Sequence, residues 1–165
     1  MQATIQKITP CLWFADQAEE AARFYTGVFT RSRIGRVTYY DEASAKVAGR
    51  PVGSVLTVEF ELDGQGFTAL NGGPVFQFTE AISFVVNCQS QQEVDHFWQR
   101  LSAGGQEVQC GWLKDRFGVS WQVVPTVLTE MLTDPDPQKA RRVMEAMLKM
   151  TKLDIDELRR AYEGR

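Results

Sequence analysis

The chain has 165 residues, 44% hydrophobic and 24% charged, which is enough to bury a core without disulfides or metals. A formal net charge of −3 and short, interrupted basic stretches argue against a nucleic-acid partner. No apolar run approaches the roughly 20 residues that cross a bilayer, and the N-terminus lacks the pattern of a signal peptide. Three widely spaced cysteines are typical of reduced thiols. We therefore expect a cytoplasmic protein with no membrane partner.

The first half of the sequence predicts a strand, a helix and three more strands. Residues 5–14 are apolar and β-rich, and Asp16 then stands where it can cap a helix that runs to about Val28. Residues 41–53 form a polar connection punctuated by Gly and Pro. The three further strands are expected at 34–40, 55–62 and 67–71, with a hairpin turn at Asp63-Gly64 between the last two.

The second half predicts the same order of elements. A strand at 81–86 precedes Ser90 and Glu93, whose spacing is that of a capping box at the start of a helix. Gly104-Gly105 ends this helix, and two strands are expected at 107–113 and 119–124.

The two halves are similar to one another. A shift of 73 residues places Phe24-Tyr25 on Phe97-Trp98. Each half is too small to close a core alone, so we predict an α+β fold of paired β-α-β-β-β modules, at about 5–73 and 80–125, forming one curved sheet. A plain α+β sandwich with accidental similarity is the alternative.

Residues 126–165 predict a C-terminal extension of amphipathic helices, belonging to the same domain as residues 1–125. One helix begins after Asp134 and Asp136, and a last one is capped by Asp154 with Glu157. Amphipathic helices must cover an apolar surface. The sequence leaves open whether that surface belongs to the same chain or to a partner.

Four segments resemble the PhnB-like group of the vicinal oxygen chelate (glyoxalase and bleomycin resistance) superfamily, often labelled 3-demethylubiquinone-9 3-methyltransferase. They lie in order at 9–14, 69–74, 110–118 and 120–125, and the second reads Ala-Leu-Asn-Gly-Gly-Pro. The resemblance extends from about Ile5 to the end of the chain. It implies the paired-module fold and a homodimer with a shared or adjoining cavity.

The resemblance also implies where a divalent metal would be held, and these positions carry unsuitable residues. They correspond to Thr9, Asn71, Gln122 and either Ile82 or its neighbour Ser83. One hydroxyl and neutral amides cannot replace the carboxylate and imidazole ligands that such cations need. The only histidine, His96, is expected within a helix. We therefore predict no metal and no cofactor.

An apolar, aromatic cavity wall remains as the candidate site. Strand alternation predicts that Cys11 and Trp13 face inward with Thr9, that Phe67 and Ala69 do so with Asn71, and that Phe84 and Ser120 also line the cavity. Filling the core is the other interpretation of the aromatic residues. Lys114 and Asp115 are expected as an exposed pair beside Trp112. The predicted ligand-binding residues are Thr9, Trp13, Asn71, Phe84, Trp112 and Gln122.

These observations favour a metal-free module that binds a small molecule of unidentified structure. The alternative is an enzyme, either a methyltransferase as the group's label states or a metalloenzyme whose ligands lie elsewhere. The first strand ends in Phe14-Ala15-Asp16, without the Gly-rich turn common in S-adenosylmethionine-dependent enzymes. The sequence therefore favours binding over methyl transfer.

Overall fold

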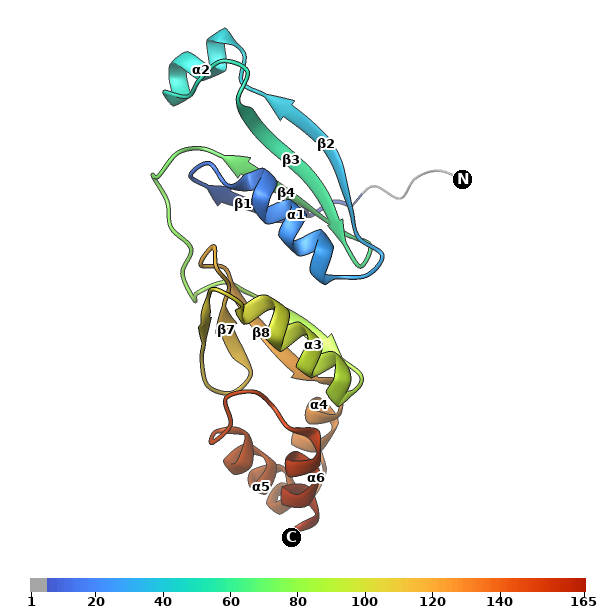
Figure 1. Ribbon diagram of the computed structural model, residues 1–165. Coiled ribbons are helices and arrows are strands. Elements are labelled where there is room, and N and C mark those ends of the chain that lie inside the picture. The colour runs from blue at the N-terminus through green and yellow to red at the C-terminus, as the bar shows by residue number, and fades with distance from the viewer. Residues whose placement is uncertain (1–5) are drawn as a thin grey trace. The chain divides into compact units, whose positions relative to one another are not determined.

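The computed structural model describes residues 6–165 of the chain. It contains two compact units, Met1–Gln77 and Phe78–Arg165, and each holds a four-stranded sheet (Figure 1). Within the described residues, every helix is too short or too polar to span a membrane.

The first unit has the predicted order of strand, helix and strands, with one added helix. Its elements are β1 (Cys11–Phe14), α1 (Ala18–Val28), β2 (Arg33–Tyr39), α2 (Glu42–Ala48), β3 (Val55–Leu62) and β4 (Gln65–Asn71). The prediction of an irregular connection at 41–53 was wrong in part, because α2 lies there. Asp41 and Ser44 form a reciprocal capping box at its start, and Gly49 ends it with a φ of 64°.

The first sheet has the strand order β1-β4-β3-β2, with β1 parallel to β4 and the other pairs antiparallel. Helix α1 lies across one face, which we call the covered face (Figure 1). There Tyr25 of α1 stacks on Phe60 with ring centroids 6.0 Å apart, and Phe60 stacks on Phe67 at 5.3 Å. The opposite face of the sheet, which α1 does not cover, is the open face.

The start of α1 differs from the prediction. Residue 17, not Asp16, occupies the N-cap position, and no side chain of the cap bonds to the helix. The backbone N–H of Ala18 instead donates to Oδ1 of Asn71 over 2.8 Å, although Asn71 is 53 residues away. Sequence reasoning could not find this partner because the contact exists only once β4 lies beside β1.

The second unit repeats the arrangement and adds three helices. Its elements are β5 (Ser83–Cys88), α3 (Gln91–Ser102), β6 (Gln106–Glu107), β7 (Trp112–Lys114), β8 (Ser120–Pro125), α4 (Thr126–Leu132), α5 (Pro137–Met147) and α6 (Ile155–Glu163). The strand order β5-β8-β7-β6 matches that of the first sheet, again with one parallel pair. The predicted paired modules are therefore confirmed. Ser90 caps α3, as expected, by accepting from Glu93 N–H.

The strand expected at 107–113 is two short strands with a tight turn between them. Cys110 and Gly111 have φ values of 61° and 80°. A Cβ on Gly111 would lie 2.8 Å from the carbonyl oxygen of Val123, so this position needs glycine. The N–H groups of both turn residues donate to carbonyls of Met150 and Thr151 in the tail.

Asp115 is buried, which contradicts the predicted exposed pair with Lys114. Its carboxylate accepts from the backbone N–H groups of Phe117 and Val119 and from the indole N–H of Trp121, at 2.8 to 3.0 Å. Lys114 forms an ion pair with Glu80 instead. Asp115 therefore holds the turn between β7 and β8.

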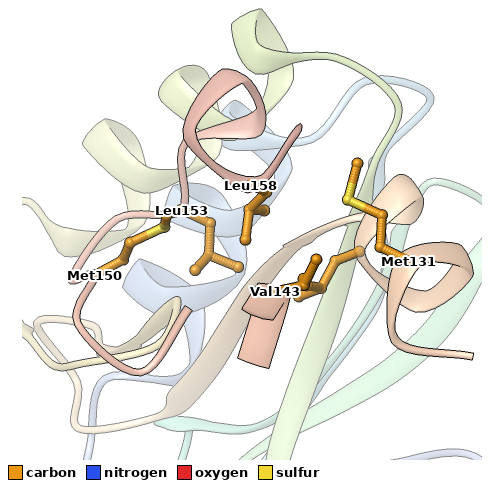
Figure 2. Close-up of a cluster of buried hydrophobic side chains, with 6 residues drawn as sticks. Met131, Val143, Met150, Leu153 and Leu158 are labelled. Atoms are coloured by element: carbon orange, nitrogen blue, oxygen red, sulfur yellow. The ribbon is translucent and has the colours of Figure 1, made fainter. Parts of the chain in front are cut away.

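The tail helices pack on their own chain. Figure 2 shows their apolar core, formed by Leu128, Met131, Val143, Met150, Leu153 and Leu158. Gln91 of α3 ties this core to the module by donating to Leu153 O and accepting from Ile155 N–H. The caps predicted at Asp136 and Asp154 are present, and α4 is an additional helix that sequence reasoning missed.

Candidate functional site

Trp13 lies on the open face of the first sheet. It pairs with Leu70 of β4, while Phe14 pairs with Asn71. Because side chains alternate along a strand, Asn71 therefore lies on the covered face with Phe67 and Ala69. The prediction that these three share a face with Trp13 was wrong, because the pairing of Trp13 with Leu70 puts Asn71 on the opposite face of the sheet. Phe67 nevertheless borders a cavity that Thr9 also lines.

Asn71 is used by the fold. It is 4% exposed, and its carboxamide accepts from Ala18 N–H and donates to Val55 O over 3.2 Å. The Tyr40 hydroxyl donates to its backbone carbonyl. Contact between Asn71 and a ligand stays a prediction.

The Trp13 ring is held in one orientation. Its Nε1–H donates to the carbonyl oxygen of Gly73 over 2.9 Å, and the ring makes a T-shaped contact with Phe76 at a centroid distance of 5.0 Å. Gly72 lies directly against the ring, because a Cβ there would be 2.0 Å from Cζ2 of Trp13. The indole is thus a fixed wall with its single polar group already satisfied.

Beside this wall is a cavity of about 720 Å³, which we call the apolar hollow. The first unit alone supplies its lining, chiefly Trp13, Tyr40, Val47, Leu56, Leu70 and Val75. Sequence reasoning missed all of these except Trp13. Leu70 could have been found only with the correct register of β4, and Val47 belongs to the helix that was not predicted.

A second cavity, of about 510 Å³, also lies on the open face, and we call it the polar hollow. Thr9 lines it, so the structure places Thr9 and Trp13 in neighbouring cavities. Its other side chains include Arg33, Arg36, Glu59, Glu61 and Thr68. Arg33 and Glu61 form a two-pronged ion pair at 2.8 and 2.6 Å, which lowers the pKa of Glu61 and raises that of Arg33.

The second sheet brings Gln122 and Trp112 together. They are directly paired across β7 and β8, on the face opposite the buried Trp121 and Val123. Gln122 donates from Nε2 to the hydroxyl of Ser83 over 2.9 Å. Of the two alternatives for the implied ligand position, Ser83 rather than Ile82 therefore lies beside Gln122.

Phe84 lies on the other face of this sheet. It pairs with Trp121, and the two rings are 5.3 Å apart, so the prediction that Phe84 shares a face with Gln122 was wrong. Counting the alternation from Ile82 puts Phe84 on the cavity side. In the structure Val85, not Phe84, pairs with Gln122 and shares its face. Core filling, the other interpretation, describes Phe84 better.

Residues 6–124 match the model of a protein family described as 3-demethylubiquinone-9 3-methyltransferase. The PhnB protein of Bacillus cereus, which carries the same methyltransferase name, is 34% identical over 73% of this chain and all of its own, with a TM-score of 0.65. The chain belongs to this family. No curated protein sequence matches it significantly.

Other solved structures support the fold of this PhnB-like chain. A Pseudomonas aeruginosa protein is 17% identical over 73% of this chain and 98% of its own, with a TM-score of 0.58. A fosfomycin resistance protein, FosX, from Listeria monocytogenes is 17% identical over 81% of this chain and 100% of its own, with a TM-score of 0.52. These proteins share the paired-module, glyoxalase-like architecture.

The implied ligand positions of the PhnB-like chain do not fit a divalent metal. The carboxamide of Asn71 is on the covered face and bonded to backbone, and Ile82 has no donor atom. Gln122 is bonded to Ser83, and neutral oxygens alone bind such cations weakly. Among residues 6–165, no three His, Cys, Asp or Glu side chains are grouped to hold a metal ion.

The residues after β1 also lack the features that usually bind a nucleotide-like methyl donor. Such cofactors are commonly bound by a Gly-rich turn after the first strand and the start of the following helix. Here β1 is followed by Ala15 and Asp16, and the first N–H of α1 is already bonded to Asn71. The start of α1 therefore has no glycine turn that would bring backbone close to a cofactor.

Proposed function

We propose that this protein is a metal-free module that binds a small apolar or aromatic molecule in the apolar hollow. The observation that supports this proposal is the cavity of about 720 Å³, which has the hydrogen-bonded ring of Trp13 as one wall. Small-molecule sites in proteins are typically concave, of this size, and lined by apolar and aromatic side chains.

The polar atoms at this hollow support the chemical class of the ligand. The Trp13 indole N–H and the Tyr40 hydroxyl both donate to backbone carbonyls, and the Ser44 hydroxyl oxygen accepts from Asp41 N–H in the α2 cap. A ligand in the hollow therefore meets carbon surface and aromatic rings. Removal of apolar area from water, at about 25 cal/mol per Å², supplies the affinity.

Binding can be measured with N-phenyl-1-naphthylamine, a neutral dye whose fluorescence rises in apolar surroundings. We expect saturable binding by the native protein and a loss of about tenfold or more in Leu70→Asn, which places an amide on the floor of the hollow. Val47→Arg, at an exposed position of the rim, provides a second variant whose fold is not at risk. Both should reduce binding.

Val52→Arg is the matched control, because Val52 is 62% exposed and does not line the hollow. It should bind the dye as the native protein does. Absence of saturable binding to the native protein, or equal binding by the Val47 and Val52 variants, would contradict the proposal. Micromolar binding of S-adenosylmethionine or of Ni²⁺, Mn²⁺, Zn²⁺ or Fe²⁺ in calorimetry would favour the enzymatic alternative.

We further propose that the protein acts as a cytoplasmic homodimer. The three free thiols of Cys11, Cys88 and Cys110 are compatible with a reducing compartment. Light scattering of the purified protein should give twice the chain mass of 18.7 kDa. A monomeric mass at micromolar concentration would contradict the dimer.

A further inference from the structure

The polar hollow and the apolar hollow are neighbours on one surface. Leu70 lines the apolar hollow and Thr68, two residues earlier on β4, lines the polar hollow. Both side chains are on the open face, and two residues of a strand span roughly 7 Å. A single small molecule can therefore reach from one hollow into the other.

A β-bulge in β2 places Arg36 at the polar hollow. Ile34 pairs with Phe60 and Val37 with Val58, so Gly35 and Arg36 together stand opposite the single residue Glu59. Such a bulge re-aims side chains, and here it brings Arg36 and Glu59 to the same cavity. A Cβ on Gly35 would already lie 3.3 Å from Glu59, which leaves little room for any other residue.

The charged side chains of this hollow divide into one ion pair and two groups, Arg36 and Glu59, that are exposed to solvent. Arg33 and Glu61 neutralise each other through their two-pronged ion pair. Within residues 6–165, neither Arg36 nor Glu59 has an ion-pair or hydrogen-bond partner for its side chain. One cation and one anion thus face the same cavity, next to the hydroxyls of Thr9 and Thr68.

We infer that the ligand is amphipathic, with an aromatic or apolar arm beside Trp13 and a zwitterionic head group between Arg36 and Glu59. This inference rests on the proposed function, because the arm occupies the apolar hollow. Arg36 would hold the carboxylate or another acid group of the head, and Glu59 would hold its ammonium group. An amino-acid-like molecule with an aromatic side chain carries these three groups.

Four indole probes test the head group separately from the arm. L-Tryptophan has both charges, indole-3-propionate has only the acid, tryptamine has only the amine, and 3-methylindole has neither. Each is titrated against the protein loaded with N-phenyl-1-naphthylamine. We expect L-tryptophan to displace the dye at concentrations about tenfold or more below those of the other three, since charge-assisted bonds discriminate by at least that factor.

Two variants test which protein side chain binds which charged group of the ligand. Arg36→Gln should weaken L-tryptophan and indole-3-propionate while leaving tryptamine unchanged, and Glu59→Gln should weaken L-tryptophan and tryptamine while leaving indole-3-propionate unchanged. The matched control is Arg23→Gln on the outer surface of α1, where Arg23 pairs with Glu19. It should change none of the four affinities.

Equal displacement by all four probes would overturn the head-group inference and leave dye binding in the apolar hollow as found. The inference also fails if no probe displaces a dye that binds well, or if Arg36→Gln and Arg23→Gln behave alike. Failure of the native protein to bind the dye at all would instead reject the proposed function.

Discussion

The substitution Gly72→Ala tests whether the Trp13 wall is held as rigidly as its contacts indicate. An added Cβ would lie 2.0 Å from Cζ2 and 2.3 Å from Cε2 and Cη2 of the Trp13 ring. Ordinary contacts between carbon atoms are about 3.5–4.0 Å, so the ring must move by at least about 1.5 Å. Gly72 has an ordinary backbone conformation, so the effect would come from the collision alone.

The cost follows from what the ring loses when it moves. Its hydrogen bond to Gly73 O has a length of 2.9 Å, and losing such a bond costs about 0.5–1.5 kcal/mol. Forcing an extra methyl group into a packed site costs about 1–3 kcal/mol more. We therefore expect the free energy of unfolding to fall by about 1.5–4.5 kcal/mol, together with weaker dye binding in the apolar hollow.

Urea denaturation followed by circular dichroism measures the change in stability, and dye titration measures the change in the hollow. Gly27→Ala is the matched control, because an added Cβ on this helical glycine meets no atom within 4 Å. It should leave binding unchanged and stabilise the protein slightly, by up to about 1 kcal/mol. A Gly72→Ala variant with native stability and native dye affinity would refute the rigid wall.

Two further predictions concern buried polar and titratable groups. Asn71→Ala should lower the free energy of unfolding by about 1–3 kcal/mol, because Ala18 N–H and Val55 O both lose their partner. Asn71→Asp is no rescue, because it would bury a carboxylate against the Val55 carbonyl oxygen; an unchanged urea midpoint for Asn71→Ala would contradict this helix-capping role. Burial raises the pKa of the Cys88 thiol from 9.0 to about 12, so the folded protein keeps a proton that the unfolded chain releases. Stability should therefore fall as pH rises between these values, by at most about 1.4 kcal/mol per pH unit, and a Cys88→Ala variant with the same slope would disprove the assignment.

The amino-acid sequence determined the architecture. Alternating apolar runs, a capping box at Ser90 with Glu93, and the repeat that relates Tyr25 to Trp98 are local or periodic signals. They fix element type and order because each depends on neighbours within a turn or a strand. The two sheets with identical strand order confirm that inference.

Tertiary structure decided which side chains share a surface. The pairing of Phe14 with Asn71 and of Val85 with Gln122 sets the phase of each strand, and a shift by one residue moves every side chain to the opposite face. For that reason sequence reasoning misplaced Asn71 relative to Trp13 and Phe84 relative to Gln122. The apolar hollow could not be predicted either, because α2 and β4 contribute to it only after the parallel pairing of β1 and β4 has formed.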